Sequence, residues 1–164
     1  MSWPVLVEEW QFECCGEPFA VGDLVQWQLS LVTDLDRPDD ASITVDGVAR
    51  GTDPGGIGPA GAFLDIGTAT VLLRPPRPAG PATVTGVFAE DHHGLVPEAL
   101  PAVTGRIIRV REISAEFQER DRVRWPVSGT WQLTDLRGFA DRSQSSITAR
   151  RATVDLLVDL AVDV

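Results

Sequence analysis

Apolar and polar residues alternate with a period of two along much of the chain. In residues 25–31, valine, tryptophan and leucine alternate with glutamine and serine. In residues 154–164, Leu156, Val158 and Leu160 fall on one face, and Asp155 and Asp159 fall on the other. Successive side chains of a strand point to opposite faces, whereas a helix would mix the two sets. Both segments are therefore predicted to be strands.

Further strands are predicted from weaker alternation, and breakers separate them. Residues 50–61 and 74–82 are rich in glycine and proline and are predicted to be loops. Gly22 and Asp23 predict a tight turn, and residues 112–120 could form one short helix. The further predicted strands cover residues 5–14, 42–48, 63–73, 83–90, 103–111, 121–127 and 129–136.

Many short strands with turn-rich connections predict an all-β fold, and we expect a single domain over residues 1–164. We expect a small antiparallel β-barrel or barrel-like sheet (OB/SH3-like), with a sandwich as the alternative. Closure protects strand edges from pairing with other chains. Gly67, Gly86, Gly105 and Gly129 lie inside predicted strands and favour the barrel, because sharply coiled strands and bulges use glycine.

Composition indicates where the protein works. No window of 18 apolar residues exists, and the start MSWPVLVEEW carries two glutamates and no basic run. We therefore expect no membrane span and no secretory signal. All fourteen basic residues are arginine, and lysine, asparagine and tyrosine are missing, which is typical of a GC-rich genome. We expect a cytoplasmic bacterial protein.

The chain is acidic, with a formal net charge of -10 that is unevenly spread. Residues 1–100 hold fifteen acids and four arginines, whereas residues 101–164 hold nine acids and ten arginines. Nucleic-acid binding depends on neutralising phosphates, so this charge disfavours it. Solubility explains the acidic surface adequately.

Two short motifs hold the residue types that bind metals. Cys14 and Cys15 lie in CCGEP (14–18), and His92 and His93 lie in EDHH (90–93). Thiolate and imidazole are natural zinc ligands, so the four residues could form a metal- or thiol-dependent site if the two loops meet. Their spacing matches no zinc module. The alternative is that Cys14 is a small core residue and that the histidines occupy a turn.

Catalysis has little support in the sequence, and we favour a protein that is not an enzyme. A cysteine–histidine nucleophile pair would need an orienting carboxylate and an oxyanion site, and no motif supplies the latter. Ser128 is not surrounded by a nucleophile elbow.

Arginines and tryptophans give the remaining candidate contact residues. Arg120, Arg122 and Arg124 alternate along a predicted strand and could follow a phosphate backbone, although cross-strand ion pairs explain them equally. Trp10, Trp27 and Trp125 lie on apolar faces and are predicted to be core residues. Trp3 and Trp131 are candidates for an exposed surface that contacts a partner, and Glu17 is a further candidate binding residue.

Several strings together resemble an actinobacterial family of uncharacterised small proteins, known as a domain of unknown function. The resemblance rests on WQFECCGEPFAVGDLVQW, AEDHHG, GRIIRV, PVSGTWQL and LLVDL, and it spans most of the chain. Its characteristic motifs are CCGEPF-x-VGD and EDHHG. It implies no activity, and TWQL departs from it, because a smaller residue is expected after the glycine.

Three functions remain open on the sequence. We favour a non-catalytic binding or interaction module for an unknown protein or small ligand. The alternative is the metal- or thiol-dependent site with zinc as a possible cofactor. The weakest alternative is a single-stranded nucleic-acid binder that uses the arginine strand.

Overall fold

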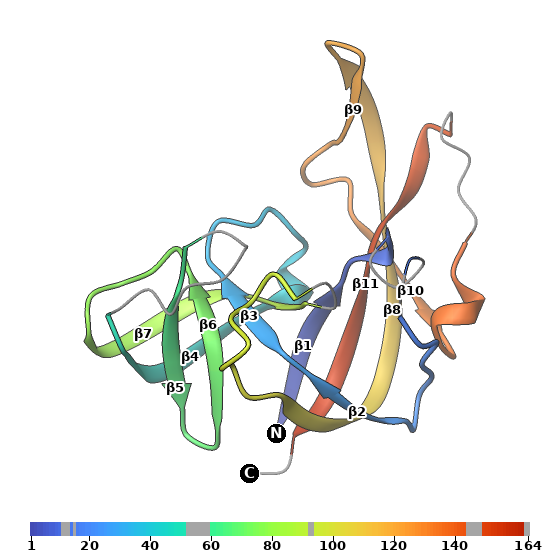
Figure 1. The fold of residues 1–164 in the computed structure, drawn as a ribbon. Helices are drawn as coiled ribbons and strands as arrows, with labels where there is room; N and C mark the ends of the chain where they lie inside the picture. The colour runs from blue at the N-terminus through green and yellow to red at the C-terminus, as the bar shows by residue number, and fades with distance from the viewer. Residues whose placement is uncertain (11–13, 15, 52–59, 92–93, 144–148, 163–164) are drawn as a thin grey trace.

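Strands make up most of this protein, as the alternation predicts. The computed structural model describes residues 1–10, 14, 16–51, 60–91, 94–143 and 149–162 (Figure 1). Strands cover 59% of the described residues, which contain no helix of seven or more residues. The elements are β1 (Ser2–Val7), β2 (Leu24–Trp27), β3 (Leu29–Val32), η1 (Asp39–Ala41), β4 (Ser42–Ala49), β5 (Ala62–Ile66), β6 (Ala69–Arg74), β7 (Gly80–Glu90), β8 (Val103–Arg120), β9 (Val123–Pro126), β10 (Gln132–Leu136), η2 (Phe139–Asp141) and β11 (Arg151–Val162).

Five strands, β3 to β7, close into a barrel, which lies at the left of Figure 1. Its order is β3–β6–β5–β4–β7, and β7 pairs again with β3. The β3–β6 pair is parallel and the other four pairs are antiparallel. Leu31, Leu64, Leu73 and Val84 fill the core from alternate positions of their strands. The predicted small barrel is therefore confirmed, and the sandwich alternative is not.

The remaining strands extend this barrel from β7. Strand β1 pairs with β7 in parallel, and β11 and β8 follow with antiparallel pairing. The 18-residue strand β8 pairs on its other edge with β2, β10 and β9 in turn. Only Gln28 separates β2 from β3. The outer strands are therefore tied to the barrel at two places, through β1 and through the β2–β3 strand.

Hydrophobic side chains cover both faces of this extended sheet. The larger cluster joins the barrel to β1, β8 and β11, and its Trp3 and Phe88 rings lie 5.0 Å apart. A smaller cluster lies on the opposite face, where Leu6, Ile113 and Leu157 pack together with Ala41 of η1. The η1 connection therefore covers sheet surface that would otherwise face water.

Several predicted elements have different bounds in the structure. The helix predicted at 112–120 is wrong, because β8 continues to Arg120 with partners along both edges. The strand predicted at 5–14 ends at Val7. The strand predicted at 63–73 is a hairpin whose turn holds Gly67 at φ +72°. Gly129 also lies in a turn, at φ +78°, whereas Gly86 and Gly105 do lie within strands.

Three residues predicted for the core lie at the surface instead. Trp27 is buried, as predicted, but Trp10 is 56% exposed and Trp125 is 55% exposed. Cys14 is exposed as well. Trp10 and Cys14 follow the end of β1, and Trp125 belongs to the β8–β9 hairpin, which projects beyond the body in Figure 1. No described helix is long and apolar enough to cross a membrane.

Candidate binding cleft

A cleft of about 400 Å³ lies across four neighbouring strands in the order β1–β7–β3–β6. Ser30 and Val32 come from β3, Ala89 from β7 and Arg74 from the end of β6, and Glu8 follows directly after β1. Segments after β3 and β7 complete the walls. The other lining residues are Asp34, Leu35, Ala60, Pro75, Glu90, Asp91 and Leu95.

Ser30 lies at the centre of this strand row. Its neighbours Leu29 and Leu31 point into the main core, so the pleat directs Ser30 to the outer face. It pairs in register with Ala89 on one side and Leu72 on the other. Its side chain is buried, with 3% exposed, and its Oγ makes no hydrogen bond within the described part of the chain. Burying a hydroxyl without a partner costs about 1–3 kcal/mol.

Arg74 places a cation on the same face. It pairs with Val32, two positions along β3 from Ser30, so the two side chains are diagonal neighbours. One guanidinium nitrogen donates to the Leu95 carbonyl oxygen at 3.1 Å, whereas the buried Nε has no acceptor. Burial lowers the pKa of Arg74, and the nearby Asp91 carboxylate opposes that shift. Ser30 Oγ and Arg74 Nε are thus two buried polar groups beside one cleft that have no hydrogen-bond partner among the residues described.

Acidic residues line the rest of the cleft, although the Glu90 side chain continues the core-facing positions of β7. Glu90 is only 4% exposed. Burial raises the pKa of Glu90 to about 8, and the negative charges of Asp91 and Glu8 add to the shift. Asp91 accepts a hydrogen bond from the Val96 backbone N–H at 2.9 Å, which holds the segment after β7 in place. At neutral pH Glu90 is therefore mostly protonated.

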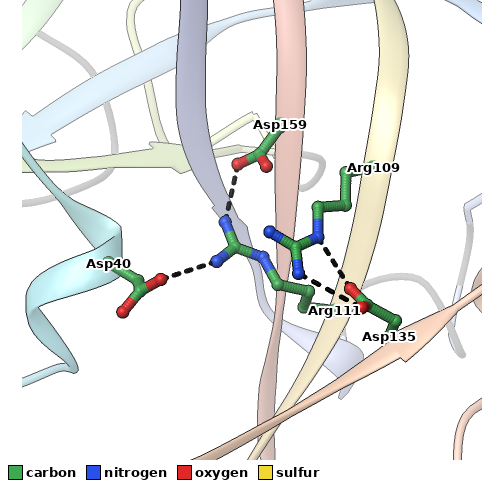
Figure 2. Close-up of polar contacts among 5 residues, drawn as sticks. All are labelled: Asp40, Arg109, Arg111, Asp135 and Asp159. Atoms are coloured by element: carbon green, nitrogen blue, oxygen red, sulfur yellow. Dashed lines mark hydrogen bonds and ion pairs between the residues drawn. The ribbon is translucent and has the colours of Figure 1, made fainter.

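Ion pairs hold the connection between β3 and β4, which forms one wall of the cleft. Arg37 donates to Asp155 at 2.6 Å, yet burial raises the pKa of Asp155 to about 6 against the opposing charge of Arg37. Figure 2 shows the buried Arg111 between Asp40 at 2.9 Å and Asp159 at 2.7 Å. These contacts tie residues 37–40 to β8 and β11. The segment that forms this wall of the cleft is therefore held in place by side chains of β8 and β11.

One family model matches nearly the whole chain. A family model described as "Family of unknown function (DUF6578)" matches residues 1–162. The chain belongs to this family. The DUF6578 match includes the barrel, the outer strands and the cleft, and it confirms the expected resemblance to a family of unknown function. No curated protein and no solved structure matches the chain.

Of the four predicted metal ligands of this DUF6578 chain, the structure describes Cys14. Cys14 is exposed, and Cys15, His92 and His93 lie outside the described residues. Among the residues that the structure describes, no group of three histidine, cysteine or acidic side chains could hold a metal ion. The two motifs do follow strands β1 and β7, which are parallel neighbours.

The three arginines of the predicted basic strand do not share a strand face. Arg120 ends β8, Arg122 lies in the turn, and Arg124 belongs to β9. Arg124 packs over the Phe117 ring, with 4.8 Å from its guanidinium carbon to the ring centroid. Asp121 and Arg122 both have positive φ, of 53° and 65°. The three arginines therefore lie on two strands and on the turn between them, rather than alternating along one strand.

The other predicted contact residues are dispersed over the DUF6578 fold. Trp3 is 4% exposed and belongs to the core, so it offers no contact surface. Trp131 is half-buried against the Leu6 cluster, with the Arg37 guanidinium 5.9 Å from its ring centroid. Glu17 is exposed at a separate shallow cleft beside Phe19.

Neither Ser30 nor Arg74 was among the predicted site residues, and Glu90 was considered only as part of the EDHH motif. One signal was present for Glu90, because it continues the core-facing positions of Val84 and Phe88 along β7. For Ser30, alternation predicts the outer face but not what covers it. Arg74 begins a segment predicted to be a loop, and no pattern there indicates its contacts.

Proposed function

We propose that this protein is a non-catalytic binding module that takes a small polar molecule into the cleft lined by Ser30 and Arg74. One observation carries the proposal: Ser30 Oγ and Arg74 Nε are both buried beside this cleft and make no hydrogen bond to the described residues. Buried polar groups in folded proteins are nearly always paired. A ligand with a hydrogen-bond acceptor would pair both groups at once.

The surroundings of Ser30 fit binding better than catalysis. A nucleophilic serine needs a general base within hydrogen-bond reach of its hydroxyl. Ser30 Oγ makes no such bond. A volume of about 400 Å³ lies at the small end of the range for ligand sites and fits a metabolite-sized molecule.

The test is saturation-transfer NMR with a defined mixture of amino acids, short peptides, organic acids, polyamines and nucleosides. We expect at least one member to bind the wild-type chain. Its signal should disappear in the Ser30→Ala variant and persist in Ser114→Ala, a half-buried serine on β8 away from the cleft. Absence of any signal that depends on Ser30 would contradict the proposal.

The stability of Ser30→Ala separates a binding role from a structural one. Because the hydroxyl has no partner, removing it should raise the free energy of unfolding without ligand by about 1–2 kcal/mol. Urea denaturation of both proteins measures the difference. A loss of stability would mean that Ser30 serves the fold, and binding data from that variant would then not support the proposal.

We propose a second candidate, a metal- or thiol-dependent site of Cys14, Cys15, His92 and His93, on one specific observation. The segments that hold these residues follow parallel neighbouring strands, and the charge of Glu8 beyond β1 raises the pKa of Glu90 at the end of β7. Elemental analysis of untagged protein purified without chelator tests it. About one zinc per chain that is lost in Cys14→Ser would support it, and a metal-free protein would contradict a metal site.

A further inference from the structure

We infer that the ligand is a small zwitterion, with a carboxylate held near Arg74 and Ser30 and an ammonium group held near Glu8. The inference deepens the proposed function and rests on it. It starts from the order of the strands, because Glu8 follows β1 at one end of the row β1–β7–β3–β6 and Arg74 ends β6 at the other. The cleft therefore has an acidic end and a basic end.

The basic end fits a carboxylate. Ser30 can donate from Oγ, and Arg74 can donate from its buried Nε, since neither atom bonds to a residue that the structure describes. The two are diagonal neighbours on paired strands and face the same side. A carboxylate has two acceptor oxygens and carries the charge that pairs with guanidinium. One carboxylate would therefore pair both orphaned groups.

The acidic side of the cleft excludes a simple anion. Glu8, Asp34 and Asp91 line the cleft with one arginine to oppose them, and Glu90 adds little charge while it is protonated. The chain as a whole carries a net charge of -10. An anion alone would enter an unfavourable field. A cation alone would leave Ser30 and Arg74 without partners.

The distance between the two ends of the cleft limits the length of the ligand. Neighbouring strands lie about 4.8 Å apart, so the first and fourth strands of the row are separated by about 14 Å. Glu8 and Arg74 also lie two residues from the aligned positions Leu6 and Leu72, in opposite directions, which offsets them by about 13 Å along the strands. The Glu8 and Arg74 side chains both extend into that span, because both line the cleft. A molecule the size of a short amino acid or a dipeptide would reach both ends.

The experiment compares three probes that share a carbon chain. They are 4-aminobutanoate, butanoate and n-butylamine, titrated into the full chain by isothermal calorimetry and two-dimensional NMR. We expect 4-aminobutanoate to bind at least about tenfold more tightly than either singly charged probe. Ser30→Ala and Arg74→Met should reduce its affinity to that of n-butylamine, and Glu8→Gln should reduce it to that of butanoate.

A matched arginine variant controls for the loss of one positive charge. Arg50 is an exposed arginine paired with Asp65 on the barrel, away from the cleft, so Arg50→Met should bind like the wild-type chain. If Arg74→Met is poorly folded by thermal melting, Arg74→Lys replaces it and should weaken the zwitterion at least about fivefold, because lysine is shorter and has no Nε donor in that place.

The outcomes separate this inference from the function on which it rests. If butanoate or n-butylamine binds as tightly as 4-aminobutanoate, and Ser30→Ala abolishes that binding, the cleft is a ligand site but its ligand is not a zwitterion. If no probe binds and the wider mixture also shows no signal that depends on Ser30, both the inference and the proposed function are wrong.

Discussion

Glu90 is a carboxylic acid in a buried position. It pairs in register with the core residue Leu29 and continues the inward positions of β7, yet it carries a carboxyl group. Alternation along residues 83–90 was enough to predict its direction, but not the depth of burial that raises its pKa. The same holds for Ser30, whose outward direction was predictable. Its burial depends on loops that no periodic pattern describes.

Replacing Glu90 with glutamine should make the protein less sensitive to alkaline pH. The folded state holds the Glu90 proton up to a pKa of about 8, whereas the ordinary value is 4.5. Stability is therefore lost as pH rises from about 4.5 to 8. The stability advantage of Glu90→Gln over the wild-type chain should grow across that interval to roughly 5 kcal/mol, at 1.4 kcal/mol per pKa unit. Urea denaturation at pH 5 and pH 8.5 measures it, and an equal advantage at both values would contradict the burial of Glu90.

At the scale of elements, strands with one buried face and one exposed face were predictable from the sequence. Strands that are buried on both faces were not. The segments 42–48 and 83–90 alternate clearly, and β4 and β7 begin and end within three residues of the predicted bounds. Strand β8 buries Arg111 and Glu112 beside Ile113, because other elements cover both of its faces. That mixture obscured the period of two and led to the predicted helix at 112–120. Trp125 shows the reverse error, since its alternation predicted a buried face that the projecting hairpin does not have.

Gly105 of β8 should not tolerate even a methyl group. A Cβ at this position would lie 2.5 Å from Leu160 Cγ and 2.9 Å from the Ala161 carbonyl oxygen. Gly105→Ala should therefore lower the free energy of unfolding by about 1–3 kcal/mol through overpacking. Thermal melting compares it with Thr104→Ala at the adjacent exposed position. Equal melting temperatures would show that β8 and β11 can separate at little cost.

The β8–β9 turn should become more rigid when its two central residues are replaced. Asp121 and Arg122 adopt positive φ, which costs side-chain-bearing residues about 1 kcal/mol or more each. The double change Asp121→Asn and Arg122→Gly supplies the residues that such a turn favours. Amide exchange of residues 118–125 should slow severalfold, while the exchange of barrel strands stays the same. Faster exchange in the hairpin would indicate a different turn.

At the scale of the whole molecule, the net negative charge and the buried acids both make the folded state less stable as pH rises. The net charge of -10 repels itself more strongly as each further carboxyl group ionises. Two buried acids, Glu90 and Asp155, resist ionisation in the folded state, with pKa values of about 8 and about 6. Arginine neighbours lower the pKa of Asp65, Asp135 and Asp141, whose contribution disappears only in strong acid.

We therefore expect maximal stability of the wild-type chain near pH 4. Above that value the free energy of unfolding falls, for Asp155 between its ordinary pKa of 3.8 and about 6 and for Glu90 between 4.5 and about 8, because each pKa is higher in the folded state than in the unfolded state. Raising the salt concentration at pH 8 should recover part of the loss by screening the repulsion. Melting temperatures from pH 3 to 9, at low and high salt, test this. A maximum above pH 8 would contradict the burial of both acids.

The pairing of β1 with β11 also sets an order for folding during synthesis. Ser2 lies opposite Ala161, so β1 is completed only when β11, which follows the other ten strands that the structure describes, leaves the ribosome. The barrel strands all lie between residues 29 and 90 and can pair while the rest is still being made. Until residues 151–162 emerge, the nascent chain exposes long edges of β1 and β8. Unpaired edges of this kind recruit other strands, so slow translation of the final segment would increase aggregation.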